Sequence, residues 1–254
     1  MARPKAQNIN DALLKITLAA RGYDNCCDIK TSGEAQFLRK LAKENPRICI
    51  DVGANTGKYT KFILENSNSD VIAFEPLQNS FEKLKSLELQ FPTRLDARNI
   101  GVADEAGELE LFYGSKNSEL ATFSVAVNEI DFVNSTNTNS VTTQVITLDS
   151  LIEPIISKYG KVDLLKIDTE GFEYNVLAGA RKFLVELKPK YIQIEFNLHQ
   201  LYAGNSLKSI SALLPDYRCF QLLPYRNGMV ERDTETPESN IFKYSNFIFK
   251  RFCD

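Results

Sequence analysis

The stretch Ile48-Cys-Ile-Asp-Val-Gly-Ala-Asn-Thr-Gly57 decides the fold, together with Val71-Ile-Ala-Phe-Glu-Pro76 further along the chain. In both stretches an apolar run typical of a strand ends on an acidic residue, and the first continues directly into a glycine turn. Two such strand ends, one βαβ unit apart, build a pocket for an adenosine-containing cofactor. A β-turn-α corner whose acid only caps the next helix is the alternative, and finding two correctly spaced corners disfavours it.

The turn itself contains residue types that let the backbone approach a ligand closely. Gly53 and Gly57 tolerate positive φ and have no Cβ in the way. Asn55 is of the non-glycine type that best tolerates the left-handed region. We therefore predict that the loop from Gly53 to Gly57, with Ala54 inside it, contacts the cofactor.

The spacing Asp51-x-Gly53-x-Asn55-x-Gly57 differs from the dinucleotide fingerprint G-x-G-x-x-G, because it has only two glycines, four residues apart. It resembles the D/E-x-G-x-G-x-G loop of class I S-adenosylmethionine (SAM) methyltransferases, with Asn55 in place of the middle glycine. The resemblance implies that the cofactor is SAM. A nicotinamide-dependent Rossmann oxidoreductase is the alternative, and the missing third glycine weakens it.

Composition places the chain in the globular class. Its 254 residues are 43% hydrophobic, which is enough for one substantial core. The formal charge is −3, from 30 basic and 33 acidic residues, so we expect no strong positive field that would attract nucleic acid. No apolar run approaches the roughly 18 residues of a membrane span, and the first residues do not form a signal peptide, so we expect no transmembrane segment.

The cysteines also bear on the compartment. Their number, five, is odd and no C-x-x-C pair occurs, so neither zinc nor a disulfide framework is expected. Cys49 lies inside the first predicted strand as a small apolar residue. We therefore predict a cytoplasmic protein. The other cysteines are Cys26, Cys27, Cys219 and Cys253.

Predicted strands alternate with predicted helices, which indicates an α/β fold with a mostly parallel sheet covered by helices on both faces. The predicted strands are 47–52, 71–75, one ending within 99–102, 162–167, 190–196 and 217–223. The helices between them are 57–66, 79–89, one that begins at 147–151, 169–187 and 206–214. An extra strand is predicted at 108–113 and a polar loop at 115–143.

The last apolar stretch, 246–251, follows a loop instead of a crossover helix, so it cannot easily run parallel to its predecessor. A last strand that lies antiparallel between 190–196 and 217–223 is typical of class I methyltransferases. We therefore predict their Rossmann-like fold, with seven strands in the sheet. Helical spacing at 9–21 and 32–44 predicts an N-terminal helical extension, residues 1–45, packed on a main domain of residues 46–254.

Ligands of open α/β sheets lie outside the carboxyl ends of the strands. At those ends the chain has Asp51, Glu75, Asn99, Asp168 and Glu195. We expect Asp51 to accept a hydrogen bond from the ammonium group of the cofactor, directly or through water. Glu75 is placed to accept both ribose hydroxyls, and Asn99 and Asp168 complete the predicted cofactor set.

The only histidine, His199, lies four residues beyond Glu195. Its ordinary pKa near neutrality suits a general base, and an inert surface or core histidine is the alternative. The predicted catalytic set is His199, Asp168, Glu195 and Glu170. Lys166 shares strand parity with Asp168, and a structural ion pair is favoured over a role as a base.

Several motifs together resemble the FkbM family of SAM-dependent methyltransferases, from about residue 32 to the C-terminus. They are Asp51-Val-Gly-Ala-Asn-x-Gly57-x-Tyr59, Phe74-Glu-Pro76, Leu148-Asp-Ser-Leu151, Asp163-x-x-Lys166-x-Asp168-x-Glu170-Gly171-x-Glu173, and Ile194-Glu195-Phe196 with His199. The Asp-x-Glu-Gly-x-Glu part is far more specific than the glycine loop. The resemblance implies O-methylation of a hydroxyl, commonly on a sugar, glycolipid or secondary metabolite, with SAM held by Gly53, Asn55, Gly57 and Glu75.

The carboxylates after strand 162–167 admit three roles. Asp168, Glu170 and Glu195 could bind a divalent cation such as Mg²⁺, which would acidify the acceptor hydroxyl. They could instead orient the cationic cofactor and the substrate hydroxyls without a metal. In the third role, Glu170 and Glu173 only stabilise a helix N-terminus.

The expected partner is a small-molecule or glycan acceptor. Nucleic acid is not expected, because the chain has no basic stripe and no Asn/Asp-Pro-Pro-Tyr sequence to hold a flipped base. A non-catalytic SAM-binding module is the remaining alternative to an enzyme, and the full set of acids at the strand ends disfavours it. The sequence does not define the oligomeric state.

Overall fold

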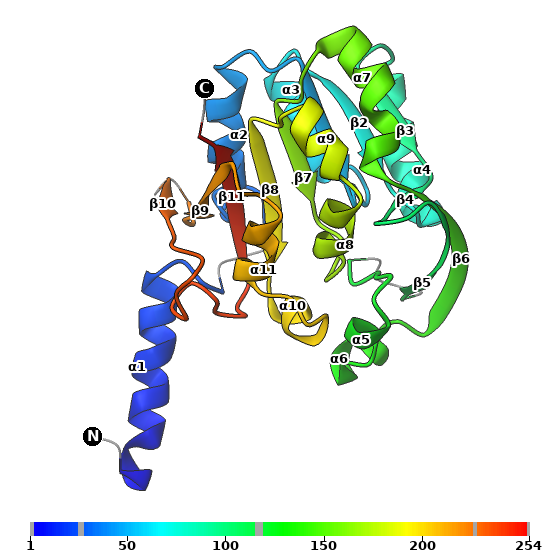
Figure 1. The fold of residues 1–254 in the computed structure, drawn as a ribbon. Coiled ribbons are helices and arrows are strands. Elements are labelled where there is room, and N and C mark those ends of the chain that lie inside the picture. Colours follow the sequence, from blue (N-terminus) through cyan, green and yellow to red (C-terminus); the bar gives the residue numbers. More distant parts are fainter. Residues whose placement is uncertain (1–2, 25–27, 115–118, 226–227, 253–254) are drawn as a thin grey trace.

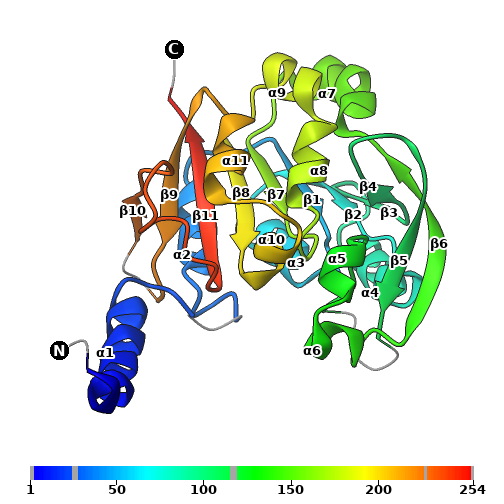
Figure 2. The same cartoon turned by 60° about the horizontal axis from the view of Figure 1, so that its bottom comes forward.

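The computed structural model describes residues 3–24, 28–114, 119–225 and 228–252. Cys26, Cys27 and Cys253 therefore lie outside the described residues. A twisted central sheet forms the middle layer of the molecule (Figures 1 and 2). Its strands follow the order β10 (Met229–Glu231), β9 (Tyr217–Leu222), β11 (Ser245–Arg251), β8 (Tyr191–Phe196), β7 (Leu164–Ile167), β1 (Ile48–Val52), β2 (Asp70–Phe74) and β3 (Leu95–Arg98).

The pairing confirms the predicted class I methyltransferase topology. β1 is parallel to β2 and to β7, and β7 is parallel to β8. β11 lies between β8 and β9 and is antiparallel to both, as predicted for the last strand. The short β10, which the sequence analysis missed, adds an eighth strand as a hairpin with β9. All five residues of β1 are buried, because helices cover both faces of a parallel sheet.

Two apolar layers hold the helices on the sheet. One layer packs Leu38, Leu64 and Leu84 against the sheet, and they come from α2 (Glu34–Ala42), α3 (Lys58–Asn66) and α4 (Gln78–Ser86). The other packs side chains of η3 (Leu148–Leu151), α7 (Ile152–Tyr159), α8 (Glu173–Ala178), α9 (Arg181–Glu186) and α11 (Leu207–Ala212) against the opposite face. The helix η2 (Leu87–Leu89) follows α4 directly.

A second, three-stranded sheet flanks the central one, with the order β4 (Gly101–Val102), β6 (Asn139–Ile146) and β5 (Gly107–Tyr113). β5 confirms the predicted extra strand. The prediction of a polar loop over 115–143 was wrong at its carboxyl end, because Val141, Thr143 and Val145 belong to β6 and pair with β5. β-Branched residues favour strands even among polar neighbours. The described remainder of this segment contains α5 (Val125–Asn128) and α6 (Asp131–Asn134).

The predicted single helix 169–187 was also wrong. The chain makes a turn up to residue 172 and then forms two short helices, α8 and α9, separated at Gly179. Any Cβ at Gly179 would collide with the carbonyl oxygen of Ala103, so a side chain cannot be accommodated there. The sequence analysis also missed α10 (Leu198–Tyr202), whose start is fixed by a capping box between Asn197 and Gln200.

The N-terminal segment begins with η1 (Pro4–Ala6) and α1 (Gln7–Ala20). α1 has no buried residue and extends away from the sheet (Figure 1), with only Leu18 packed against the core. The division of the chain at residue 45 stays a prediction. None of the described helices combines the length and the apolar character needed to cross a membrane. The cytoplasmic compartment stays a prediction as well.

Candidate functional site

The loop after β1 has the backbone that its sequence predicts. The φ angles of Gly53, Asn55 and Gly57 are 77°, 48° and 80°, all in the left-handed region. The Gly53 N–H donates to the carbonyl oxygen of Phe74 at 3.0 Å, which ties the loop to the end of β2. A Cβ on Gly53 would collide with the carbonyl oxygen of Asp168, so this position requires glycine. The loop therefore lies directly against the carboxyl ends of β2 and β7.

Glu75, just after β2, is bonded to this loop. Its Oε2 accepts the Asn55 N–H at 2.8 Å, and its Oε1 accepts the Leu77 N–H at 2.8 Å. Burial raises the pKa of Glu75 to about 7, although the two N–H donors favour the charged form. A carboxylate has about four acceptor positions, so both oxygens retain capacity for ligand hydroxyls.

A narrow hollow lies beside the loop. Its volume is about 80 Å³, well below the roughly 300–1,000 Å³ of typical small-molecule sites, so a nucleoside-sized cofactor enters only if lining side chains move. Of the predicted site residues, those that line the hollow are Gly53, Asn55, Glu75, Asp168 and Glu170. Those outside the lining are Asp51, Ala54, Gly57, Asn99, Glu195 and His199. Asn99 instead donates from Nδ2 to the carbonyl oxygens of Glu75 and Pro76, at 2.9 and 3.0 Å.

Asp51 is completely buried below the hollow. Its Oδ2 accepts the Thr60 hydroxyl at 2.6 Å, and its Oδ1 lies 3.4 Å from Lys166 Nζ. Lys166 also pairs with Asp168, at 3.0 Å. Burial lowers the pKa of Lys166, but the charges of Asp168, Asp51 and Glu34 outweigh it and raise the pKa above its usual value. The structural ion pair predicted for Lys166 is therefore present.

A polar row crosses the middle of the sheet. In the pairing of the strands, Lys166 of β7 lies between two polar partners. They are Asp51 on β1 and Gln193 on β8. Gln193 Oε1 accepts the Tyr59 hydroxyl at 2.6 Å, and its Nε2 donates to Glu34 at 2.6 Å. Glu34, in the first turn of α2, is buried in this network. Gln193 and Tyr59 were missed by the sequence analysis.

The predicted carboxylates converge at the ends of β7 and β8. One oxygen from each of Asp168, Glu170 and Glu195 lies within 4.8 Å of the others. Burial raises the pKa of Glu170 and of Glu195 well above the usual value, and the charge of Asp168 raises both further. Three carboxyl groups this close together can bind a cation or accept hydrogen bonds from ligand hydroxyls, because either would offset the repulsion between their negative charges.

His199, on α10, joins this cluster. Its Nδ1 lies 2.8 Å from Glu170 Oε2, and its ring stacks on Phe132 of α6 with centroids 6.1 Å apart. Within the described residues Nδ1 has no partner in regular hydrogen-bond geometry, so the approach to Glu170 is close but not aligned. Burial lowers the pKa of His199, against the opposing charges of Glu173 and Asp168. A neutral imidazole of this kind can accept a proton at pH 7.

The turn that holds Glu170 is fastened by Glu173. Glu173 accepts the Thr169 N–H at 2.8 Å and the Gly171 N–H at 3.0 Å, and Gln200 Nε2 donates to it at 2.6 Å. Glu170 has a φ of 52°, a strained value for a glutamate. Glu173 therefore organises the turn, and Gln200 connects the turn to the helix that contains His199. Gln200 was missed by the sequence analysis.

Buried acids make the stability of this site depend on pH. Burial raises the pKa of Glu34, Glu75, Glu170, Glu173 and Glu195. Each of these carboxyls binds its proton more tightly folded than unfolded, so stability falls as pH rises from the unfolded pKa through the folded one. We expect the Tm of the ligand-free protein to be lower at pH 8 than at pH 6.5, with Glu75 alone contributing about 1 kcal/mol, or roughly 2–4 °C.

Scanning calorimetry at constant ionic strength measures this slope. The lowered pKa of His199 acts in the opposite direction up to slightly above its ordinary value of 6.5, so it offsets part of this slope only at the lower end of the window. The control is Glu75→Gln, which removes one titrating group at nearly constant volume and should flatten the profile between pH 6.5 and 8. A Tm that stays constant or rises over this window contradicts the prediction.

Comparison with known proteins gives consistent matches. The family model described as Methyltransferase FkbM domain matches residues 51–220, more than half of the chain. Hexuronic acid methyltransferase AglP of Haloferax volcanii is 25% identical over 186 residues, which are 72% of this chain and 69% of that protein.

Solved structures are also similar in fold, at low sequence identity. An O-methyltransferase from Bacillus cereus in complex with SAH is 13% identical, with a TM-score of 0.46, over 94% of this chain and 88% of that one. An rRNA methylase from Streptococcus thermophilus is 11% identical, with a TM-score of 0.45, over 86% of this chain and 94% of that one.

Proposed function

The chain belongs to the FkbM family of SAM-dependent methyltransferases, and from this premise we propose that it methylates a hydroxyl of a sugar, a glycoconjugate or a secondary metabolite. SAM supplies a methyl group on a sulfonium that leaves as a neutral thioether. One observation carries the proposal: the buried His199 lies 2.8 Å from Glu170, in the acid cluster at the carboxyl ends of β7 and β8. An acceptor hydroxyl requires such a base, because its proton must leave during transfer.

Gly53, Asn55, Gly57 and Glu75 are the residues that we propose to hold SAM. Gly53 and Gly57 have positive φ and leave no room for a Cβ, because Asp168 and Leu87 lie against them, so the loop is held in one path beside the hollow. Glu75 connects that loop to the end of β2. Asp51 is completely buried, so it supports this site through Lys166 and through water rather than by direct contact.

The acceptor hydroxyl then binds between the loop and His199. His199 receives the hydroxyl proton, and Glu170 orients the ring through Nδ1, which leaves Nε2 for the acceptor. Asp168 and Glu195 accept hydrogen bonds from neighbouring hydroxyls of the acceptor. These contacts hold the acceptor oxygen in line with the methyl group. Such alignment of the reacting groups is the main source of rate acceleration in a site of this kind.

Each acid of the cluster already has a partner. Asp168 pairs with Lys166, Glu170 approaches His199, and Glu195 accepts the Asn197 amide at 2.7 Å. We therefore expect methyl transfer to continue in EDTA. A divalent cation held by Asp168, Glu170 and Glu195 is the alternative role of the cluster, and its signature is activity lost to EDTA and restored by Mg²⁺. Initial rates with and without chelator, after dialysis, decide between the two.

The named relative acts on a hexuronic acid, and this supports a carbohydrate acceptor for the present chain. The test is incubation with methyl-labelled SAM and a panel of acceptors: neutral oligosaccharides, uronic-acid oligosaccharides and small phenols. Mass spectrometry then locates the label. We expect it on a hydroxyl oxygen of a sugar. Label on nitrogen contradicts the proposal, and label on a phenol contradicts the carbohydrate acceptor. If no acceptor is labelled although SAM binds, the non-catalytic module replaces the enzyme.

A further inference from the structure

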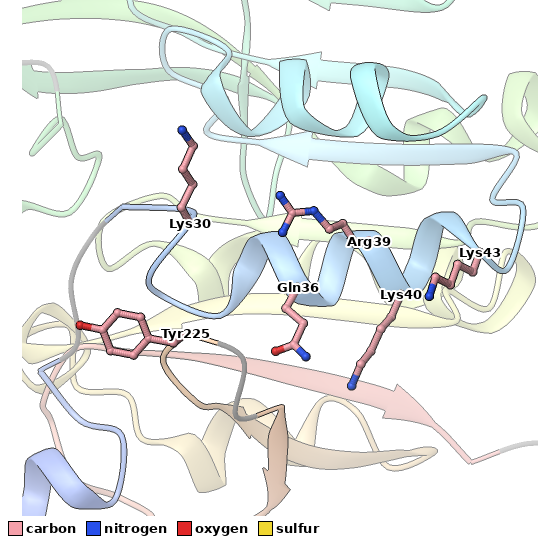
Figure 3. A pocket seen from close by; sticks show the side chains of 6 residues that line it. All are labelled: Lys30, Gln36, Arg39, Lys40, Lys43 and Tyr225. Atoms are coloured by element: carbon pink, nitrogen blue, oxygen red, sulfur yellow. The ribbon is translucent and has the colours of Figure 1, made fainter.

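A second hollow lies on the outer face of α2, and it shares no lining residue with the hollow beside the glycine loop. Its volume is about 550 Å³, within the roughly 300–1,000 Å³ range of small-molecule sites. Figure 3 shows its lining side chains spread along α2, with Tyr225 and Lys30 toward the amino-terminal end of the helix and Lys43 toward the other end. The lining residues are Lys30, Gln36, Arg39, Lys40, Lys43 and Tyr225.

Four of these six residues are cations and none is an acid. Across the described ranges no carboxylate oxygen lies within the 4.0 Å ion-pair distance of any of the four. The acids of the same helix region bind elsewhere: Glu34 is buried against Gln193, and Glu44 pairs with Lys190 at 2.8 Å. Asp28 accepts the backbone N–H of Lys30 at 2.7 Å, so one acid lies close to this hollow. Within the described residues, however, none of the four cations has an ion-pair partner.

The arrangement differs from an ordinary solvated helix end. Arg39 lies in the last turn of α2, and Lys43 follows directly after the helix, four residues further on, a spacing at which like charges repel. The dipole of the helix favours cations in its last turn, which accounts for Arg39 and Lys40. It does not account for Lys30, which precedes the helix. The four cations come from two segments of the chain and line the same hollow, although their side chains extend in different directions (Figure 3).

Two neutral residues complete the lining. Gln36 lines the hollow, and its Oε1 is buried without a hydrogen-bond partner within the described parts of the chain, so rotation of this amide toward the hollow would give the oxygen a ligand hydroxyl as its partner. Tyr225 is exposed and offers an aromatic face at the other end of the hollow. Arg39 is itself held over the ring of Phe62, 5.4 Å from the centroid, which restricts its guanidinium.

We propose that this hollow binds a nucleoside diphosphate. The ammonium groups and the Arg39 guanidinium match two phosphates, since charge-assisted bonds from Lys and Arg are the usual means of phosphate recognition. Gln36 accepts a ribose hydroxyl, and the base stacks on Tyr225. The proposal goes beyond methyl transfer and does not depend on it, because the two hollows have separate linings.

Calorimetric titration of UDP into the full chain tests this site. SAH is added at saturation so that the nucleotide cannot enter the cofactor hollow. We expect UDP to bind, uridine not to bind, and the triple variant Arg39→Gln, Lys40→Gln, Lys43→Gln to weaken UDP binding by at least about tenfold. Tyr225→Ala should weaken it as well. The matched control is Lys161→Gln, Arg181→Gln, Lys182→Gln, which removes the same charges from exposed positions elsewhere and should leave UDP binding unchanged.

Three results would overturn the proposal. The first is no UDP binding to the unaltered chain at millimolar concentration. The second is equal weakening in the control variant, which would indicate only general charge attraction. The third is sedimentation with phosphatidylglycerol vesicles that depends on these cations while UDP does not bind, which assigns the face to a membrane surface. SAH affinity, measured for each variant, reports folding. A protein that binds UDP but not SAH contradicts the proposed methyltransferase site and leaves this proposal intact.

Discussion

Replacing Glu75 by alanine is expected to weaken SAM binding by at least about 100-fold while the sheet stays folded. The carboxylate accepts the Asn55 and Leu77 N–H groups, so its removal leaves two donors unpaired and loosens the loop, which keeps only its backbone bonds to Phe74 at the end of β2. The ribose hydroxyls lose their acceptor at the same time. Each hydrogen bond to a charged group contributes about 1.5–3 kcal/mol, so the loss of two accounts for the expected change.

Calorimetry at pH 8 measures this effect, because the pKa of Glu75 is about 7 and the carboxylate is then charged. For the same reason the unaltered chain should bind SAM more tightly at pH 8 than at pH 6. The matched control is Glu82→Ala on α4, an exposed glutamate that bonds only to Gln78 and should not change the affinity. A Kd for SAM within twofold of the parent in Glu75→Ala, with Tm unchanged, would remove Glu75 from the cofactor site.

The sequence predicted the central sheet because parallel strands are apolar throughout and end on polar residues. β1, with five buried residues followed by a glycine turn, is such a strand. The failures share a cause: in each, tertiary contacts outweighed local composition. In 134–143 many polar residues suggested a loop, but pairing with β5 makes residues 139–143 part of a strand. The helix predicted over 169–187 is interrupted at Gly179, where the backbone of Ala103 comes too close for any side chain.

The residues of the candidate site also fall into those that the sequence could predict and those that it could not. Residues at strand ends could be predicted, because parallel strands all end at the same edge of the sheet, and ligands bind at that edge. Gln193 and Gln200 could not, since their roles depend on register and on a neighbouring helix. One signal was available for Gln193. It is a polar residue flanked by two isoleucines inside a buried strand, and it shares strand parity with Glu195 just as Lys166 does with Asp168.

Replacing His199 by alanine is expected to lower kcat by about 10²–10⁴-fold, the usual contribution of a general base. SAM affinity should change by no more than about twofold, because His199 lies outside the lining of the cofactor hollow. Burial lowers the pKa of His199, so the unaltered enzyme should keep full kcat at pH 7 and lose it only below the ordinary pKa of 6.5. Initial rates from pH 5 to 8, with labelled SAM and an acceptor that the panel shows to be a substrate, measure the change in kcat and its dependence on pH. Calorimetric titration measures the SAM affinity.

Glu170→Gln separates a base from a merely structural histidine. Glu170 acts through His199 as a positioning residue, since its Oε2 lies 2.8 Å from Nδ1. An amide at this place keeps the volume but cannot take up or release a proton beside Nδ1. The apparent pKa below which kcat is lost should therefore differ between this variant and the parent, whereas KM for the acceptor should change little. A structural histidine would give the same profile in both proteins. If His199→Ala retains the parent kcat, another group removes the proton. Asp168 and Glu195, the other two carboxylates of the cluster, are then the residues to replace next.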